Sequence, residues 1–189
     1  YVDKKEILET VETILHYDKK ELTPETMKRW ETLRDNLVGT GFPSLMRRYV
    51  AMDLLEDKFD EDGQRVDKAE SHIKALAQQV LSNHELLRPE LSWLVTPEAK
   101  NGYRFAYELG RQDKEFSLLP LLLKKQRGVA DDKNSSDYLL GGYLKALFER
   151  DPEQWEHLMD ELAEDKKLAI WVADFTWRSG MSDRAALRV

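Results

Sequence analysis

Apolar residues recur every three or four positions along almost the whole chain, and this periodicity limits the fold more than any other feature. Near the start, Ile7, Val11, Ile14 and Leu15 have the spacing of one face of an α-helix. Residues 155–162 repeat this pattern close to the other end. Strict alternation of apolar and polar residues, which is typical of half-buried strands, is almost absent. The sequence therefore predicts an all-α fold.

Capping signals mark where several of these helices begin and end. Thr-Pro-Glu at 23–25 and 96–98, and Asp-Pro-Glu at 151–153, each place a capping side chain directly before a proline. Such a side chain accepts a hydrogen bond from a free N–H of the first turn, and proline is tolerated at the first helical position. We expect helices to begin at each of these prolines and to end at Gly39 and Gly180. Caps and stripes together predict about nine helices with short connections.

Two further prolines affect the predicted boundaries. Pro43 comes directly before a helix that we expect to run through Leu55. A second helix is expected from Asp113 onward, and Pro120 within it predicts a kink or a later start, because proline has no N–H and its ring clashes with the preceding turn.

An internal echo refines the predicted architecture. Residues 102–106 (GYRFA) match residues 142–146 (GYLKA) at an offset of 142 − 102 = 40, and Leu118-Leu119 matches Leu158-Met159 at the same offset. A period near 40 built from two helices resembles HEAT or armadillo-type repeats. That resemblance implies stacked antiparallel helix pairs, an α-solenoid in which each pair covers the apolar face of the previous one. An irregular multi-helix bundle is the alternative.

We expect one helical module over residues 1–189, with sub-units at 1–60, 67–127 and 136–180. The chain begins at Tyr1 without methionine, and a helix expected near Ser182 has room for only about two turns. These two features predict a module that belongs to a longer protein.

The composition indicates which cellular compartment and which classes of partner are expected. The chain has no cysteine, which excludes disulfides and thiolate ligands and favours the cytoplasm. No apolar run approaches the roughly 20 residues needed to span a bilayer. The formal net charge of −7 disfavours binding to a phosphate backbone, so no nucleic-acid partner is expected. Acidic residues concentrate at 56–70 and 149–165, where they indicate solvated helix ends and faces.

The sequence contains no complete motif for a metal site, a cofactor site or a catalytic site. Asp60–Gly63 resembles part of a calcium loop, but the ligand positions at its two ends fall on Lys58 and Ala69, so a polar turn between helices is expected. The glycine-rich segment 39–44 lacks the Gly-Lys-Ser/Thr ending of a phosphate loop, and no HExxH or Gly-x-Ser-x-Gly motif occurs. We therefore predict no catalytic residue, no cofactor and no bound metal. A carboxylate-dependent hydrolase stays a remote alternative, because nothing selects one pair among the 36 acids.

Trp177 is the candidate centre of an interaction surface. It lies off the apolar stripe formed by Trp171 and Phe175, at the end of its predicted helix. Three basic residues accompany it: Arg178, Arg184 and Arg188. Tryptophan and arginine are enriched where proteins bind one another. Two interpretations are open: Trp177 packs against a following repeat, or the four residues bind a partner.

The favoured function is a non-catalytic helical-repeat module for protein interaction or scaffolding within a larger multidomain protein. Its partner would be a protein, either flanking domains of the same chain or a separate molecule, because solenoids act through long exposed surfaces. The alternative is a sensor or regulatory arm of a larger bacterial-type nucleotide-driven or nuclease effector.

Overall fold

The computed structural model describes residues 4–18, 20–39, 41–51, 57–59 and 65–188. Helices account for most of these residues, so the all-α prediction is confirmed. The described part contains eleven α-helices, nine of them seven residues or longer, in agreement with the expected number. None of the described helices is long and apolar enough to cross a membrane.

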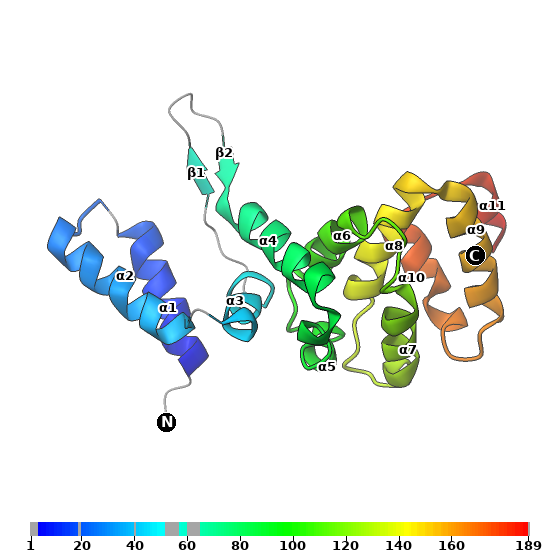
Figure 1. Ribbon diagram of the computed structural model, residues 1–189, viewed down its shortest axis with the longest axis horizontal. Helices are drawn as coiled ribbons and strands as arrows, with labels where there is room; N and C mark the ends of the chain where they lie inside the picture. Colours follow the sequence, from blue (N-terminus) through cyan, green and yellow to red (C-terminus); the bar gives the residue numbers. More distant parts are fainter. Residues whose placement is uncertain (1–3, 19, 40, 52–56, 60–64, 189) are drawn as a thin grey trace.

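The α-helices lie along an elongated molecule (Figure 1). They are α1 (Lys4–Tyr17), α2 (Pro24–Val38), α3 (Phe42–Tyr49), α4 (Lys68–Ser82), α5 (Leu91–Leu94), α6 (Gly102–Gln112), α7 (Leu119–Val129), α8 (Tyr138–Arg150), α9 (Pro152–Glu164), α10 (Val172–Ser179) and α11 (Asp183–Arg188). Short 3₁₀ turns occur at His84–Leu86 and Ala169–Trp171.

A two-stranded ribbon between α3 and α4 was not predicted. Strand β1 (Asp57–Phe59) pairs antiparallel with β2 (Arg65–Asp67). The helix expected to run through Leu55 ends at Tyr49, and Leu55 itself lies outside the described residues. The calcium-like segment 60–63 also lies outside them, but strands rather than helices flank it.

Several predicted caps are confirmed by their hydrogen bonds. The Thr23 hydroxyl accepts from the Thr26 N–H at 3.2 Å, and the Asp151 carboxylate accepts from the Gln154 N–H at 2.9 Å. Gly39 follows α2 with φ of 75°, a left-handed value that glycine adopts without strain. Local sequence therefore determines these helix ends.

The helix predicted at Pro97 begins five residues later, at Gly102. Thr96 caps only a turn, since its hydroxyl accepts from the Glu98 N–H at 3.3 Å. The Asn101 N–H donates to the Val50 carbonyl at 2.9 Å, which ties this segment to the end of α3. Here a tertiary contact outweighs the local signal.

Pro120 marks a later helix start, one of the two predicted outcomes. Helix α7 begins at Leu119, so the proline lies in its first turn. Asp113 precedes the turn that leads into it, and its carboxylate accepts from the Leu118 N–H at 3.0 Å. That turn carries Phe116 at φ 50°, the one non-glycine residue with positive φ in the described part of the chain.

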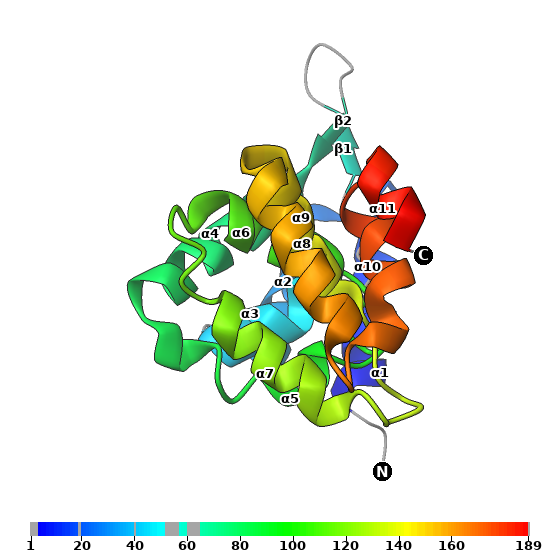
Figure 2. The same cartoon turned by 90° about the vertical axis from the view of Figure 1, so that its right-hand side faces the viewer.

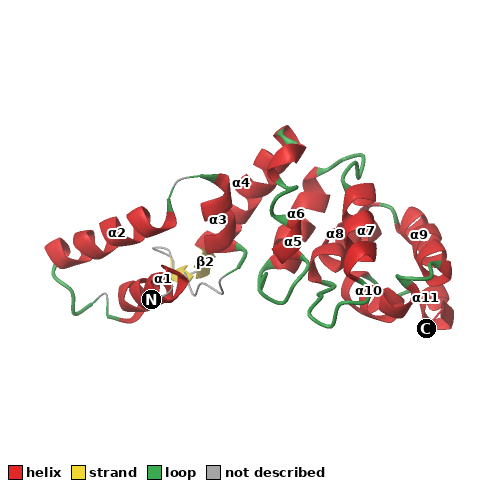
Figure 3. Cartoon of the chain, turned by 90° about the horizontal axis from the view of Figure 1, so that it is seen from below, coloured by secondary structure: helices red, strands yellow, loops and turns green. Residues whose placement is uncertain are grey.

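Helices α4, α6 and α8 pack side by side along the middle of the molecule (Figure 3). Between α6 and α8 the backbones touch: a Cβ built on Gly142 would lie 2.9 Å from the Tyr103 carbonyl carbon, and one on Gly110 would lie 2.7 Å from the Ala146 Cβ. The start of α6 thus faces the start of α8, and the two helices run parallel. The two segments related by the 40-residue echo are therefore in direct contact.

Candidate interaction surface

The four predicted surface residues lie at the C-terminal end of the molecule, on α10 and α11 (Figure 2). The structure brings Arg184 and Arg188 together against α9. Arg178 lies at the end of α10, where it pairs with another helix. Trp177 points to solvent with 78% of its surface exposed. The four residues therefore do not form one continuous surface.

Trp177 is one of three exposed apolar residues in and next to α10, and the other two were not predicted as surface residues. Ile170 lies in the 3₁₀ turn directly before α10, and Met181 lies two residues after the end of the helix. The exposed fractions of Ile170, Met181 and Trp177 are 78%, 61% and 78%. The side of the helix opposite Trp177 is buried and includes Val172 and Phe175. We call Ile170, Trp177 and Met181 the α10 stripe.

Arg178 ties three helices together instead of joining this stripe. Its guanidinium pairs with Asp137 and lies 4.3 Å from the Tyr138 ring centre, at the start of α8. Its backbone carbonyl accepts a hydrogen bond from the Tyr103 hydroxyl of α6 at 2.7 Å. Its contacts show that this arginine holds α10 in place.

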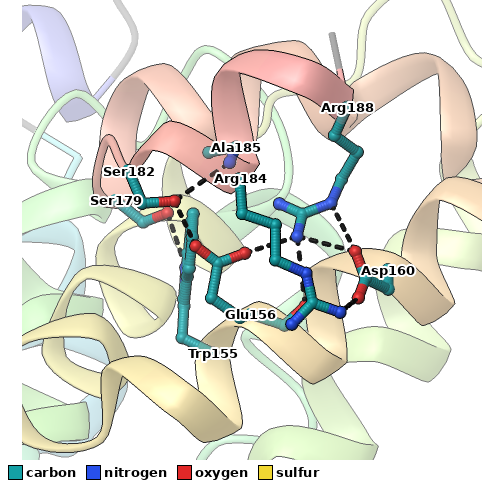
Figure 4. Close-up of polar contacts among 8 residues, drawn as sticks. All are labelled: Trp155, Glu156, Asp160, Ser179, Ser182, Arg184, Ala185 and Arg188. Carbon is teal, nitrogen blue, oxygen red and sulfur yellow. Dashed lines mark hydrogen bonds and ion pairs between the residues drawn. The ribbon is translucent and has the colours of Figure 1, made fainter.

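Arg184 and Arg188 face two carboxylates of α9, Glu156 and Asp160, which we call the α9 acid pair (Figure 4). Arg188 Nη2 lies 2.5 Å from Glu156 Oε2, and Arg188 Nε lies 2.8 Å from Asp160 Oδ1. The side chain of Arg188 is only 6% exposed, whereas that of Arg184, which pairs with Asp160, is 53% exposed.

Ser182 begins α11 and links it to the same cluster. Its hydroxyl accepts from the Ala185 N–H at 2.9 Å, as an N-cap does, and donates to Glu156. The side chain of Ala185 is fully buried, whereas those of Ala186 and Leu187 are exposed. Helix α11 thus rests on α9 through one alanine and a set of polar contacts.

The charges of the α9 acid pair are stabilised in the folded protein. Burial alone would raise the pKa of Glu156, but hydrogen bonds from Ser182 and Arg188 lower it below its ordinary value. The hydrogen bond from Arg188 is the main cause that lowers the pKa of Asp160. Both groups are therefore ionised at neutral pH, which maintains their attraction to the arginines.

The aromatic ring of Trp155 lies next to the ion pairs between α9 and α11. The indole of Trp155 is fully buried, and its Nε1–H donates to the Ser179 hydroxyl at 2.9 Å (Figure 4). The guanidinium carbon of Arg188 lies 5.9 Å from the centre of that ring, within the range of a cation–π contact.

The acid pair was not predicted, because residues 149–165 were expected to form solvated helix ends and faces. Glu156 is instead only 12% exposed in its side chain. The available signal was the spacing of Glu156 and Asp160, four apart on one face of a helix that contains neither lysine nor arginine. Like charges so placed repel one another, and this points to a cation from elsewhere.

Other buried acids serve local structure. Asp113 accepts from the Tyr143 hydroxyl at 2.6 Å, and Glu90 accepts from the Trp93 indole. A polar hollow between α4 and α6 is lined by two cations, Lys74 and Arg111, and each is paired with a glutamate. Within the described residues, no group of three or more His, Cys, Asp or Glu side chains is placed to hold a metal ion.

No protein-family model, curated protein or solved structure matches this chain.

Proposed function

We propose that this chain is a non-catalytic helical module that binds another protein through the α10 stripe. The observation that carries the proposal is the 78% exposure of Trp177 on a well-packed helix, with the exposed apolar residues Ile170 and Met181 directly before and after that helix. Exposing a large aromatic side chain to water is unfavourable, and clustered exposed apolar residues typically mark a contact surface. Tryptophan is also among the residues that contribute most to binding energy.

We further infer that α6 and α8 are the equivalent first helices of two HEAT-like units, each followed in the chain by a second helix, α7 and α9. The 40-residue echo supports this, as does the close parallel packing of α6 on α8. In such an array the face of the last helices is where a further unit or a partner would add. The α10 stripe lies at this end of the molecule (Figure 2).

Site-specific photo-crosslinking in cells would test the proposal. A photoreactive amino acid at position 177 is expected to give one or a few discrete protein adducts. The matched control carries the same group at Ala186, which is exposed on α11 outside the stripe. Trp177→Glu should abolish the interaction of the captured protein with the chain while leaving the helical circular dichroism unchanged.

Two results would contradict the proposal. One is an identical set of adducts from positions 177 and 186. The other is an enzymatic activity of the intact protein that is lost on a point change within this chain while binding at Trp177 is unaffected.

A further inference from the structure

Helix α11 is docked on α9 almost entirely through polar contacts. Ala185 is the one apolar side chain of the helix that is buried, and Leu187 is 90% exposed. A helix of six residues is not stable in isolation, because the cost of forming the first turn exceeds the gain from so few hydrogen bonds. The ion pairs to α9 therefore decide whether α11 is ordered.

The surface beneath α11 has the chemistry that recognises a guanidinium group. Glu156 and Asp160 offer carboxylate oxygens 2.5 and 2.8 Å from two different nitrogens of Arg188, and the Glu156 carbonyl lies 3.3 Å from one of them. Trp155 supplies an aromatic face on the same side. Planar, forked hydrogen bonding to carboxylates distinguishes arginine from lysine.

Helix α9 requires a cation at this position. Its sequence contains five acidic residues and neither lysine nor arginine: Glu153, Glu156, Asp160, Glu161 and Glu164. With α11 removed, the acid pair would face no positive charge from its own helix, and mutual repulsion would destabilise that turn.

The fit of Arg188 in this place is incomplete. Its side chain is more than nine-tenths buried, yet Nη1 has no hydrogen-bond partner among the described residues. A buried donor left unpaired costs free energy and weakens the docking of the helix that carries it. An arginine of another molecule that makes a more complete set of hydrogen bonds could therefore replace Arg188 at this position.

We propose that Trp155, Glu156 and Asp160 form a recognition site for an arginine side chain, which Arg188 fills within the same molecule. Residues 182–188 then act as a strap that covers the site, and an arginine-bearing segment of a partner protein displaces it. This site is separate from the α10 stripe, and it stands whether or not that stripe binds a protein.

The first test uses the full chain with Arg188→Ala and follows amide hydrogen exchange. Exchange of residues 183–188 is expected to accelerate at least tenfold, while exchange in α6 and α8 stays unchanged. Ethylguanidinium should restore the protection of α11 in a saturable manner, because it refills the site. Ethylammonium at the same ionic strength should not, since it lacks the forked donors. Arg29→Ala, which removes a largely exposed ion pair of α2, is the matched control.

The second test uses the unmodified chain and a peptide with the sequence of residues 181–188. Excess peptide is expected to speed exchange of the strap several-fold by competing for the acid pair, and the same peptide with both arginines replaced by lysine should have no effect.

Three results would overturn the proposal: unchanged exchange of α11 in Arg188→Ala, equal rescue by the two cations, or equal effects of the two peptides. If Arg188→Ala unfolds the whole chain, Arg188→Lys replaces it. Normal protection of α11 in that variant would then overturn the proposal, and loss of protection that ethylguanidinium restores would support it.

Discussion

The contact between α6 and α8 and the contact between α9 and α11 represent two opposite ways of joining helices. In the first, glycines let the backbones touch, and apolar side chains such as Phe105 and Leu144 are fully buried around them. In the second, arginines of one helix meet carboxylates of the other, with a single buried alanine between them.

The difference predicts how each contact responds to change. Close apolar packing is not itself weakened by salt or acid, so the packed part of the α6–α8 contact is lost only when the core unfolds. The α9–α11 contact buries only one apolar side chain and otherwise depends on ion pairs, so it opens by itself at a lower cost in free energy than the core. The first contact should therefore define the fold, and the second should be adjustable.

The largest effect is expected from Gly142→Ala in the α6–α8 contact. The new Cβ would overlap backbone atoms of Tyr103, which cannot rotate away as a side chain does. We expect a loss of about 3 kcal/mol in the free energy of unfolding, measured by urea denaturation. Gly128→Ala is the control, because no heavy atom lies within 4 Å of its added Cβ. It should raise stability by about 0.5 kcal/mol. Equal stability of the two variants would mean that α6 and α8 are not in backbone contact.

The next largest loss of stability is expected when the buried hydroxyl of Tyr143, also in the α6–α8 contact, is removed. Tyr143→Phe removes a 2.6 Å hydrogen bond to Asp113, a residue that is only 5% exposed, and should cost about 2 kcal/mol. Tyr107→Phe, which removes a solvent-exposed bond to Glu149, should cost less than about 1 kcal/mol.

The loss in Tyr143→Phe should also depend on pH. Burial raises the pKa of Asp113, but hydrogen bonds from Tyr143, Leu118 and Ser117 outweigh it, so the pKa lies below its ordinary value. Such a group stabilises the fold above about pH 4, and this contribution is lost as the pH falls through its folded pKa. The difference between wild type and variant should therefore shrink in acid. A difference that is constant from neutral to acid pH would argue against an ionised Asp113.

A smaller effect, confined to one helix, is expected when the α9–α11 contact is acidified. The pKa values of Glu156 and Asp160 are both lowered in the folded protein, so docking of α11 is favoured above about pH 4 and weakens as the pH falls below it. NMR amide signals of residues 183–188 should shift toward disordered positions before those of α8 change. One common midpoint for both helices would show that the two contacts are not independent.

The smallest effect is expected for Arg184→Ala. This side chain is 53% exposed, and its partner Asp160 is 38% exposed, so the pair should contribute less than about 0.5 kcal/mol to the docking of α11. About 1 M NaCl should remove even this contribution, because salt screens exposed charges. Hydrogen exchange of α11 at low and high salt measures it, and a tenfold effect at high salt would place Arg184 inside the recognition site.

Much of the fold follows from local patterns. Thr23, Asp151 and Gly39 act within one turn of their own position, so their roles were predictable. The start of α6 was not, because the Asn101 N–H binds the Val50 carbonyl about 50 positions earlier in the chain. The β1–β2 ribbon was missed because each strand has only three residues, too few to show an alternating pattern.

The sequence by itself determined the helical fold and placed a tryptophan near three arginines in the chain. It could not show which of these side chains stay free. Arg178 is 41 positions from its partner Asp137, and Arg188 is 28 positions from Asp160. Helical periodicity acts over three or four residues, whereas ion pairs form between any groups that folding brings within a few ångströms. Only the tertiary structure therefore decided that Trp177 faces solvent while Arg188 is buried in its own protein.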